Sequence, residues 1–275
     1  MEPKTRGKLY WIFATCLTLL WISPILATLL TSLKSLEELN QGLYWSFPKE
    51  FKFSNYYEAF ITGGFSNYFI NSVIYTIPSL IFILLLSSMN GFALAKYRFR
   101  GRKSIVLMFL AGMLIPFQIL LIPVFYLSNN VLHTYDTFLG VILFHIAFQL
   151  GFSSYFMRNF INTIPDSVIE AARIDGCSEF KIYYSIVLPL MKPALAALST
   201  LLFTWIWNDY LWALVLIQTD ELKPITVALD NLKGQWVASY HLQSAGSIIA
   251  AIPPVLIFIF LQKHFIKGLT MGSGK

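Results

Sequence analysis

The chain has 275 residues, of which 56 % are hydrophobic and only 12 % are charged. Soluble globular proteins carry roughly 25 % charged residues, and 24 Phe, 14 Tyr and 7 Trp on a soluble surface would form large, aggregation-prone apolar patches. The composition therefore excludes a soluble enzyme, a disordered protein and a nucleic-acid-binding module. The net charge of +6 can be interpreted only together with the positions of the basic residues in the sequence.

Cysteine and histidine offer no sign of a disulfide framework or a metal centre in the sequence. Cys16 lies in the first apolar run and Cys177 in a polar loop, so we do not expect the two to meet. No Cys/His pattern has the spacing of a zinc site. We therefore expect neither a metal nor another cofactor to be bound by this chain.

Six apolar runs are each long enough to cross a hydrocarbon core of about 30 Å. They cover residues 9–30, 69–95, 105–127, 138–157, 194–217 and 246–265. Because backbone polar groups in lipid must form hydrogen bonds within their own segment, we expect every run to be a helix. The first run is too long for a signal-peptide core, and no A-x-A cleavage site follows it. The sequence predicts an all-α integral membrane protein with six transmembrane helices in one domain, 1–275.

The basic residues predict the orientation of these helices. Fifteen of the 20 Lys and Arg residues fall in the N-terminal segment, the second and fourth loops and the C-terminal tail. The other five, in the intervening loops, are Lys34, Lys49, Lys52, Lys223 and Lys233. Because cytoplasmic loops are enriched in Lys and Arg, both termini are predicted to lie in the cytoplasm. The basic excess is thus a signal of topology in a cell membrane and not of nucleic-acid binding.

The loop 158–193, between the fourth and fifth runs, is unusually long and of mixed polarity. Pro165 followed by Asp166 or Ser167 predicts the start of a helix, with one of these two side chains as its cap. Gly176 stands where that helix would have to end with a positive φ angle. A short exposed helix can insert into a groove of another protein, or it can pack on its own bundle. The residues alone leave both roles open.

A second short helix is predicted after Gly176, over 178–187. Leu188-Pro189 follows it, and we expect this pair to end the helix because proline disfavours a helical conformation in the residue before it. The loop is therefore predicted to be a helical hairpin with its sharp turn at Gly176.

Three short motifs in this loop resemble the EAA loop of ABC importer permeases: Glu170-Ala171-Ala172, Asp175-Gly176 and Leu188-Pro189. Four further stretches, 92–103, 115–123, 205–211 and 261–270, are similar to carbohydrate importers of the maltose-permease G type. The resemblance extends over nearly the whole chain. It implies that the loop forms a coupling helix that seats in a cleft of a cytoplasmic ATPase. The implied ATPase-coupling residues are Glu170, Ala171, Ala172, Asp175, Gly176, Leu188 and Pro189.

The same resemblance implies a set of partners. A second, homologous permease would complete a heterodimer, two copies of an ATPase would bind beneath it, and an extracytoplasmic binding protein would deliver a sugar. ATP and Mg²⁺ would be used by the partner ATPase and not by this chain. Within the family the substrate is expected to be an oligosaccharide or a disaccharide.

Polar and aromatic side chains inside the apolar runs are candidates for the sugar pathway. Sugars are held by groups that match their hydroxyls and by aromatic faces, and a bilayer tolerates such polar groups only inside a bundle. The candidates are Asn71, Gln118, Trp205, Asn208, Asp209 and Tyr210, with His145 and Gln149 as further ones. For Asp209, a hydrogen bond between helices at a subunit interface is an alternative role.

Two other classes of function are compatible with a polytopic membrane protein. An ion-coupled secondary transporter needs ionisable relays and often shows interrupted repeats, whereas this chain has one carboxylate well inside an apolar run and no obvious duplication. A membrane-embedded enzyme would need a nucleophile–base pair or a motif such as H-E-x-x-H, and the sequence contains none.

Overall fold

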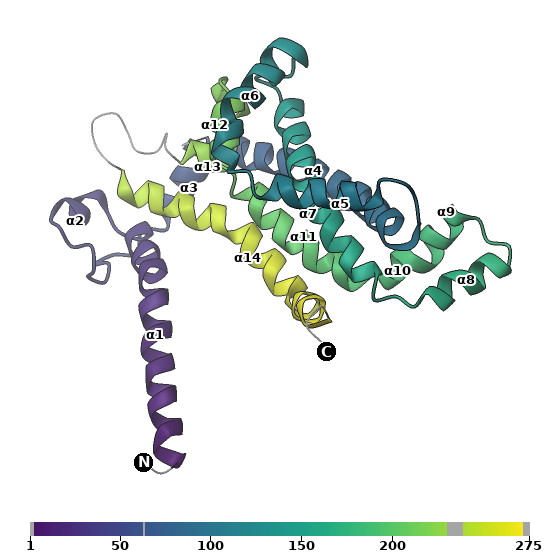
Figure 1. The fold of residues 1–275 in the computed structure, drawn as a ribbon. Helices are drawn as coiled ribbons and strands as arrows, with labels where there is room; N and C mark the ends of the chain where they lie inside the picture. The colour runs from purple at the N-terminus through teal and green to yellow at the C-terminus, as the bar shows by residue number, and fades with distance from the viewer. Residues whose placement is uncertain (1–2, 63, 230–238, 272–275) are drawn as a thin grey trace. The chain divides into compact units, whose positions relative to one another are not determined.

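The computed structural model describes residues 3–62, 64–229 and 239–271 (Figure 1). Every regular element in these residues is helical. Four helical spans are long and apolar enough to cross a membrane: Tyr10–Ser32, Phe65–Lys96, Phe138–Ile161 and Tyr240–Gln262. The number rises to six if each of two bent helix pairs is one span. The prediction of an all-helical membrane protein is confirmed. Lys233 and Lys275, two of the residues used for the orientation, lie outside the described residues.

The chain divides into two compact units, Met1–Asn67 with Ala228–Ile252 and Tyr68–Val227 with Pro253–Lys275. The first unit contains α1 (Pro3–Ser32), α2 (Leu36–Asn40), α3 (Ser54–Tyr57) and η1 (Glu58–Thr62), together with the first part of α14 (Tyr240–Met271). The window of α1 that is apolar enough to span a membrane has none of its residues buried. Exposure of so many apolar side chains to water would be unfavourable, so this helix is suited to a lipid environment.

A buried lysine orders the segment that follows α1. Lys34 is fully buried, and its ammonium donates to the carbonyl oxygens of Leu43 and, at 2.9 Å, of Tyr44. The amide of Asn55 donates to the carbonyl oxygens of Ser32 at 2.9 Å and Lys34 at 2.8 Å. Burial lowers the pKa of Lys34 below its usual value. These bonds fix the end of α1 to the chain up to residue 55.

The second unit contains the remaining elements. They are most of α4 (Phe65–Lys96), α5 (Arg102–Met113), η2 (Phe117–Leu120), α6 (Leu121–Tyr126), η3 (Leu127–Val131), α7 (Phe138–Ile161), α8 (Asp166–Ile174), α9 (Glu179–Ile182), η4 (Tyr183–Val187), α10 (Leu188–Leu190), α11 (Lys192–Trp207), α12 (Leu211–Leu216), η5 (Asp220–Leu222), most of α13 (Ile225–Ala228) and the rest of α14. Its main hydrophobic core joins Ile83 of α4, Met157 and Ile161 of α7, and Leu198 and Leu202 of α11.

The prediction of one continuous helix over 105–127 is wrong. Arg102–Met113 and Phe117–Val131 are separate segments bent by 95° at the break between them. Pro116 explains the break because it has no N–H to donate and disfavours a helical conformation at Ile115. The first, second, fourth and sixth predicted runs each lie within one continuous helix.

The predicted run 194–217 is also interrupted. The helix α11 ends at Trp207 and α12 begins at Leu211, so Asn208, Asp209 and Tyr210 lie between them. Asn and Asp side chains compete for nearby backbone groups and favour helix ends. The side chain of Asp209 does so here, by accepting hydrogen bonds from the first amides of α12.

Candidate functional sites: the α8–α9 hairpin and a lined groove

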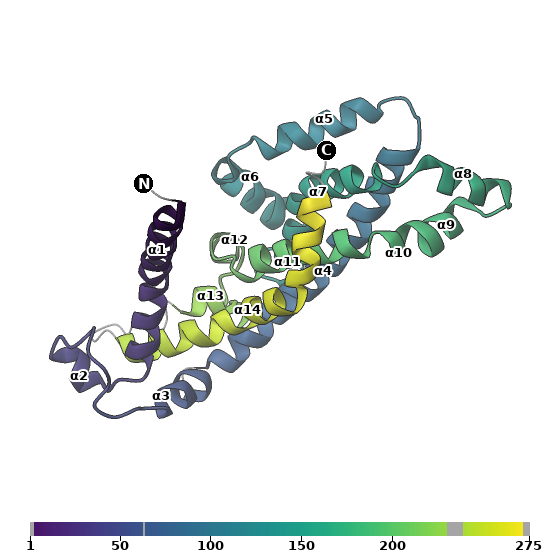
Figure 2. The same ribbon diagram turned by 90° about the horizontal axis from the view of Figure 1, so that it is seen from below.

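The helices α8 and α9 form a hairpin at one end of the second unit, and both views show it projecting past α10 (Figures 1 and 2). The end of α8 has the predicted geometry. Gly176 has φ = +77°. The amide of Cys177 donates to the carbonyl of Ala172 and that of Gly176 to the carbonyl of Arg173, each at 3.0 Å. This pair of bonds is a Schellman motif, which satisfies the last carbonyls of the helix.

The start of α8 differs from the prediction. The N-cap residue is Pro165, which has no side chain able to cap, and α8 begins at Asp166. Neither Asp166 nor Ser167 caps the helix. Instead the carboxylate of Asp166 accepts a hydrogen bond from Lys96 at 2.6 Å, which lowers the pKa of Asp166 below its usual value.

The second arm of the hairpin is longer than predicted. Ser178 caps α9 by accepting a hydrogen bond from the amide of Lys181 at 3.4 Å. Helical structure then continues past residue 187, so Leu188 and Pro189 do not end it. Pro189 occupies one of the first positions of α10, where no intrahelical N–H bond is needed. The bend of 73° falls after Leu190, before α11 begins at Lys192.

The two faces of α8 have different environments. Ile169 and Ala172 are buried in the hydrophobic core of the second unit. Glu170, Ala171 and Ile174 face outward, and Ile174 is 86 % exposed. On the second arm Phe180 is 71 % exposed. Large apolar side chains at this exposure at the tip of a hairpin are typical of a protein-binding surface. Of the predicted coupling residues, Glu170, Ala171, Asp175, Gly176 and Pro189 are exposed, Leu188 is half-buried and Ala172 is buried.

A groove with a volume of about 1290 Å³ opens on the second unit. It is lined by the segments around the bend at Pro116, by α7 and by the end of α11 with the start of α12. Four of the six predicted pathway residues line it: Trp205, Asn208, Asp209 and Tyr210. His145 and Gln149 line it as well. The structure thus brings the aromatic and polar candidates of the fourth and fifth runs together.

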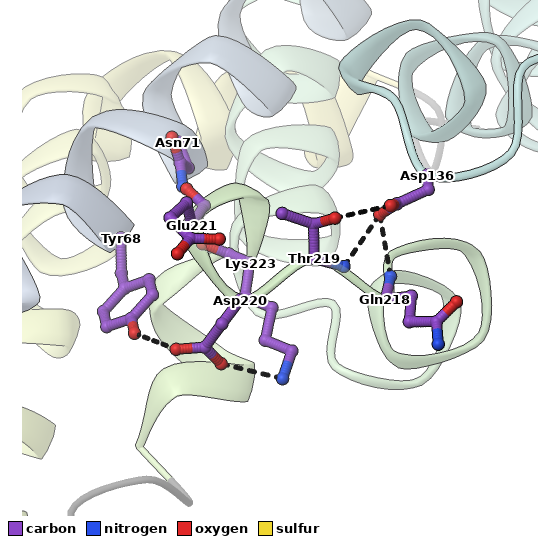
Figure 3. A network of polar contacts seen from close by, with 8 residues as sticks. All are labelled: Tyr68, Asn71, Asp136, Gln218, Thr219, Asp220, Glu221 and Lys223. Atoms are coloured by element: carbon purple, nitrogen blue, oxygen red, sulfur yellow. Dashed lines mark hydrogen bonds and ion pairs between the residues drawn. The ribbon is translucent and has the colours of Figure 1, made fainter.

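The other two predicted pathway residues lie elsewhere. Asn71 is buried, and its amide donates to the carbonyl oxygens of Glu221 at 2.7 Å and Lys223 at 2.9 Å. The two hydrogen bonds of the Asn71 amide therefore hold the η5 segment against α4 (Figure 3). Gln118 is an exposed residue of η2 and is not among the residues that line the groove.

Asp209 forms part of the groove wall, and its carboxylate also binds the first amides of α12. Its side chain is 13 % exposed. One carboxylate oxygen accepts from the amide of Trp212 at 3.3 Å and the other from that of Ala213 at 3.1 Å. His145 Nε2 lies 3.6 Å from the second oxygen. The run 194–217 was predicted as one helix, so the capping role of Asp209 was missed, although Asn208-Asp209 is a pair that favours helix ends.

Aromatic rings line the same groove as this carboxylate. Trp212 stacks on Phe144 with their ring centroids 3.8 Å apart. Trp205 packs against Phe152 at 5.2 Å. Such rings provide an apolar surface beside the polar groups of Asn208 and Tyr210. The groove therefore offers the mixture of flat apolar faces and hydrogen-bonding groups that suits a sugar.

A second polar network, which the sequence did not indicate, fixes the segment after α12 (Figure 3). Asp136 accepts hydrogen bonds from the amides of Gln218 and Thr219, both at 2.9 Å, and from the Thr219 hydroxyl at 2.6 Å. Burial raises the pKa of Asp136, but these hydrogen bonds outweigh it and bring the pKa below its usual value. Asp220 accepts from Tyr68 at 2.7 Å and pairs with Lys223 at 2.8 Å.

The capping geometry of Asp209 predicts a graded response to substitution. Asp209→Asn keeps a carbonyl oxygen that can accept from one of the two amides, so we expect folded protein in near-normal yield. Asp209→Leu leaves both amides without their partner, which costs about 1–3 kcal/mol when they are buried. The yield of monodisperse protein in detergent measures the difference. Equal yields for the Leu and Asn variants would contradict a structural role for this carboxylate.

The hairpin and the groove together define a class of protein: an all-helical membrane protein with a lined polar–aromatic groove and an exposed helical docking element. The family model for the binding-protein-dependent transport system inner membrane component matches residues 87–271. The chain belongs to this family and is a permease subunit of an ABC transporter. In such a transporter ATP hydrolysis is carried out by a partner ATPase.

Individual relatives cover almost the whole chain. It is 36 % identical over 267 residues to the arabinooligosaccharides transport system permease protein AraQ of Bacillus subtilis, covering 96 % of this chain and 94 % of that protein. It is 31 % identical to the melibiose/raffinose/stachyose import permease protein MelC of the same species, over 92 % and 91 % of the two chains. The fold is similar to that of a bacterial ABC transporter involved in the import of the acidic polysaccharide alginate, with a TM-score of 0.84, 25 % identity and coverage of 96 % and 99 %.

Proposed function

We propose that this chain is a permease subunit of a sugar importer whose substrate is an oligosaccharide or a disaccharide. The observation that carries the proposal is the position of Trp205, Asn208, Asp209 and Tyr210 in the wall of one groove. The names of the relatives support the same substrate class, since AraQ is named for arabinooligosaccharides and MelC for melibiose, raffinose and stachyose.

The α8–α9 hairpin is the coupling element of this permease. Its exposed residues Glu170, Ala171 and Ile174 form the face that enters a cleft of the ATPase, and Gly176 provides the turn that aims it. Ala172 acts from the opposite face by seating α8 on the core. Leu188 and Pro189 continue the second arm toward α11 and contribute through its geometry.

The complete transporter would contain a second, homologous permease, two copies of the ATPase and an extracytoplasmic binding protein. The whole chain, residues 1–275, would act as one transmembrane permease domain with both termini in the cytoplasm. A solved transporter of similar fold is described in complex with a periplasmic protein that carries an alginate pentasaccharide, which supports the role of a binding protein as partner.

Uptake in proteoliposomes tests the function. The permease pair, the ATPase and the binding protein would be reconstituted together and offered labelled raffinose and arabinotriose as probes. We expect uptake that requires Mg²⁺-ATP and the binding protein and that is insensitive to an ion gradient. Uptake driven by a proton or sodium gradient without ATP would identify an ion-coupled secondary transporter instead.

The orientation has its own test, because most of the basic residues lie in alternate loops. Single cysteines at Arg100→Cys and Trp45→Cys, in a chain lacking Cys16 and Cys177, would be treated with a membrane-impermeant thiol reagent outside intact cells. Trp45 is 73 % exposed, so the cysteine there should react and the one at position 100 should not. The opposite pattern would place the hairpin outside the cell and overturn its coupling role.

A further inference from the structure

The last residue of α4 is bonded to the hairpin although the two are far apart in the sequence. The ammonium of Lys96 donates to the carbonyl oxygen of Ile164 and to the carboxylate of Asp166, each at 2.6 Å. The Lys96 side chain is only 5 % exposed. An exposed ion pair contributes little by itself, but loss of this buried donor also leaves the carbonyl of Ile164 without its bond. The contact therefore joins α4 to the residues that enter α8.

A second contact joins Tyr97, the residue after Lys96, to the second arm of the hairpin. The hydroxyl of Tyr97 donates to the carboxylate of Glu179, at the start of α9. Glu179 in turn accepts from the Arg173 guanidinium at 2.7 Å and 3.3 Å. The guanidinium carbon of Arg173 lies 5.7 Å from the centroid of the Tyr97 ring, which is within range of a cation–π contact.

The protonation states of Tyr97 and Glu179 allow the hydrogen bond between them. The Arg173 guanidinium, with the Tyr97 hydroxyl, holds the pKa of Glu179 below its usual value. Burial and the neighbouring Glu179 carboxylate raise the pKa of Tyr97 to about 12. At neutral pH the phenol is therefore protonated and can donate, and the carboxylate is ionised and can accept. The ring of Tyr97 is also packed edge-on against Phe92 of α4, with their centroids 5.5 Å apart.

The two contacts hold the hairpin on both sides of its turn. One lies at the start of α8 and the other after Gly176, so α8 cannot rotate away from α4 without breaking at least one of them. Besides these contacts, a buried hydrogen bond between the Ser88 and Tyr183 hydroxyls at 2.7 Å joins α4 to the second arm just after α9. The Lys96 and Tyr97 contacts are the side-chain bonds from the end of α4 to α8 and α9 themselves in the described part of the chain. Movement of one element is transmitted to another where discrete contacts make them a single rigid body.

We propose that Lys96 and Tyr97 are positioning residues that lock the α8–α9 hairpin to the end of α4, so that a movement which the ATPase imposes on the hairpin passes directly to α4. The role as a transmission element rests on the proposed function. The lock itself is a property of this chain and can be tested without any partner.

The test measures the distance between spin labels on α4 and on the hairpin. The labels would be attached at Met89→Cys, an exposed residue of α4, and at Lys181→Cys, an exposed residue of α9, after Cys16 and Cys177 are replaced by Ser. In the native background we expect a narrow distance distribution that is the same with ADP and with Mg²⁺-ATP plus vanadate when the ATPase is bound. In Lys96→Met/Tyr97→Phe the distribution should broaden at least about two-fold and shift between the two nucleotide states.

Matched substitutions separate the lock from general destabilisation. Lys103→Met and Tyr155→Phe make the same chemical changes at residues for which no side-chain bond is found in the described part of the chain, and they should leave the distribution narrow. Lys96→Arg keeps the cation and should also remain narrow.

Each outcome bears on one statement. A double variant with the native width, measured without ATPase, would overturn the lock and leave the proposed function intact. Failure of the ATPase to bind the unsubstituted permease would overturn the proposed function, while a broadened distribution in the double variant would still support the lock. A shift between the two nucleotide states in the native background would overturn transmission through a rigid body.

Discussion

Replacement of Gly176 by valine should abolish most sugar uptake while the membrane helices remain folded. A residue with a Cβ in the left-handed region costs about 1 kcal/mol or more, and the cost is larger for a β-branched residue. Because φ at this position is +77°, valine would open the Schellman turn and change the direction in which α8 points. A change of about 1.4 kcal/mol shifts the population of the native turn about ten-fold. Co-purification of the ATPase and uptake in proteoliposomes should both fall several-fold.

The surroundings of Gly176 show which kind of substitution matters. No heavy atom lies within 4 Å of the position that a Cβ would occupy, so the effect of valine comes from backbone strain and not from a clash within this chain. Gly176→Asn is the matched control because Asn tolerates the left-handed region better than other residues with a Cβ. We expect uptake in the order Gly, Asn, Ala, Val. Equal uptake for Asn and Val would show that the φ angle of this turn is unimportant for coupling.

The parts of the fold that the sequence predicts well are those decided by local chemistry. Four of the apolar runs lie in continuous helices because length and hydropathy suffice to define them. Gly176 ends α8 because a Schellman turn needs a residue that accepts positive φ. The break at Pro116 was not predicted, because a proline in an apolar run does not by itself mark a break: Pro24 and Pro78 lie inside the continuous helices α1 and α4.

The contacts that were missed depend on residues far apart in the chain. Lys96 and Asp166 are separated by 70 positions, and their carboxylate–ammonium bond takes Asp166 away from the capping role that its position suggested. Asn71 is polar and lies within an apolar run, as a pathway residue would, yet its donors are used by backbone carbonyls 150 and 152 positions away. A buried polar group needs a partner, but the sequence does not say whether that partner is substrate or backbone.

Replacement of Gly91 by valine should prevent α4 and α7 from packing together and should greatly reduce the yield of folded protein. A Cβ built on Gly91 would lie 2.7 Å from the Cβ of Met157 and 2.9 Å from the backbone nitrogen of Arg158. The backbone of α7 cannot move aside without disturbing the core around Met157, which is fully buried. Overpacking of a core costs about 1–3 kcal/mol and occasionally more. In membranes small residues permit such close helix approach, and Ser87 and Ser88 of α4 are buried nearby.

A matched glycine in the same unit distinguishes packing from helix propensity. Gly112 is helical, like Gly91, but a Cβ there would meet no atom within 4 Å. Since Ala is favoured over Gly in a helix by roughly 0.5–1 kcal/mol, Gly112→Ala should leave the thermal midpoint of the purified protein unchanged or raise it, whereas Gly91→Ala should lower it and Gly91→Val should lower it further. The midpoint is followed by the loss of monodisperse protein on heating in detergent. If Gly91→Ala were as stable as Gly112→Ala, the result would contradict the close packing of α4 on α7 at this position. The core that seats the hairpin would then have to be packed differently.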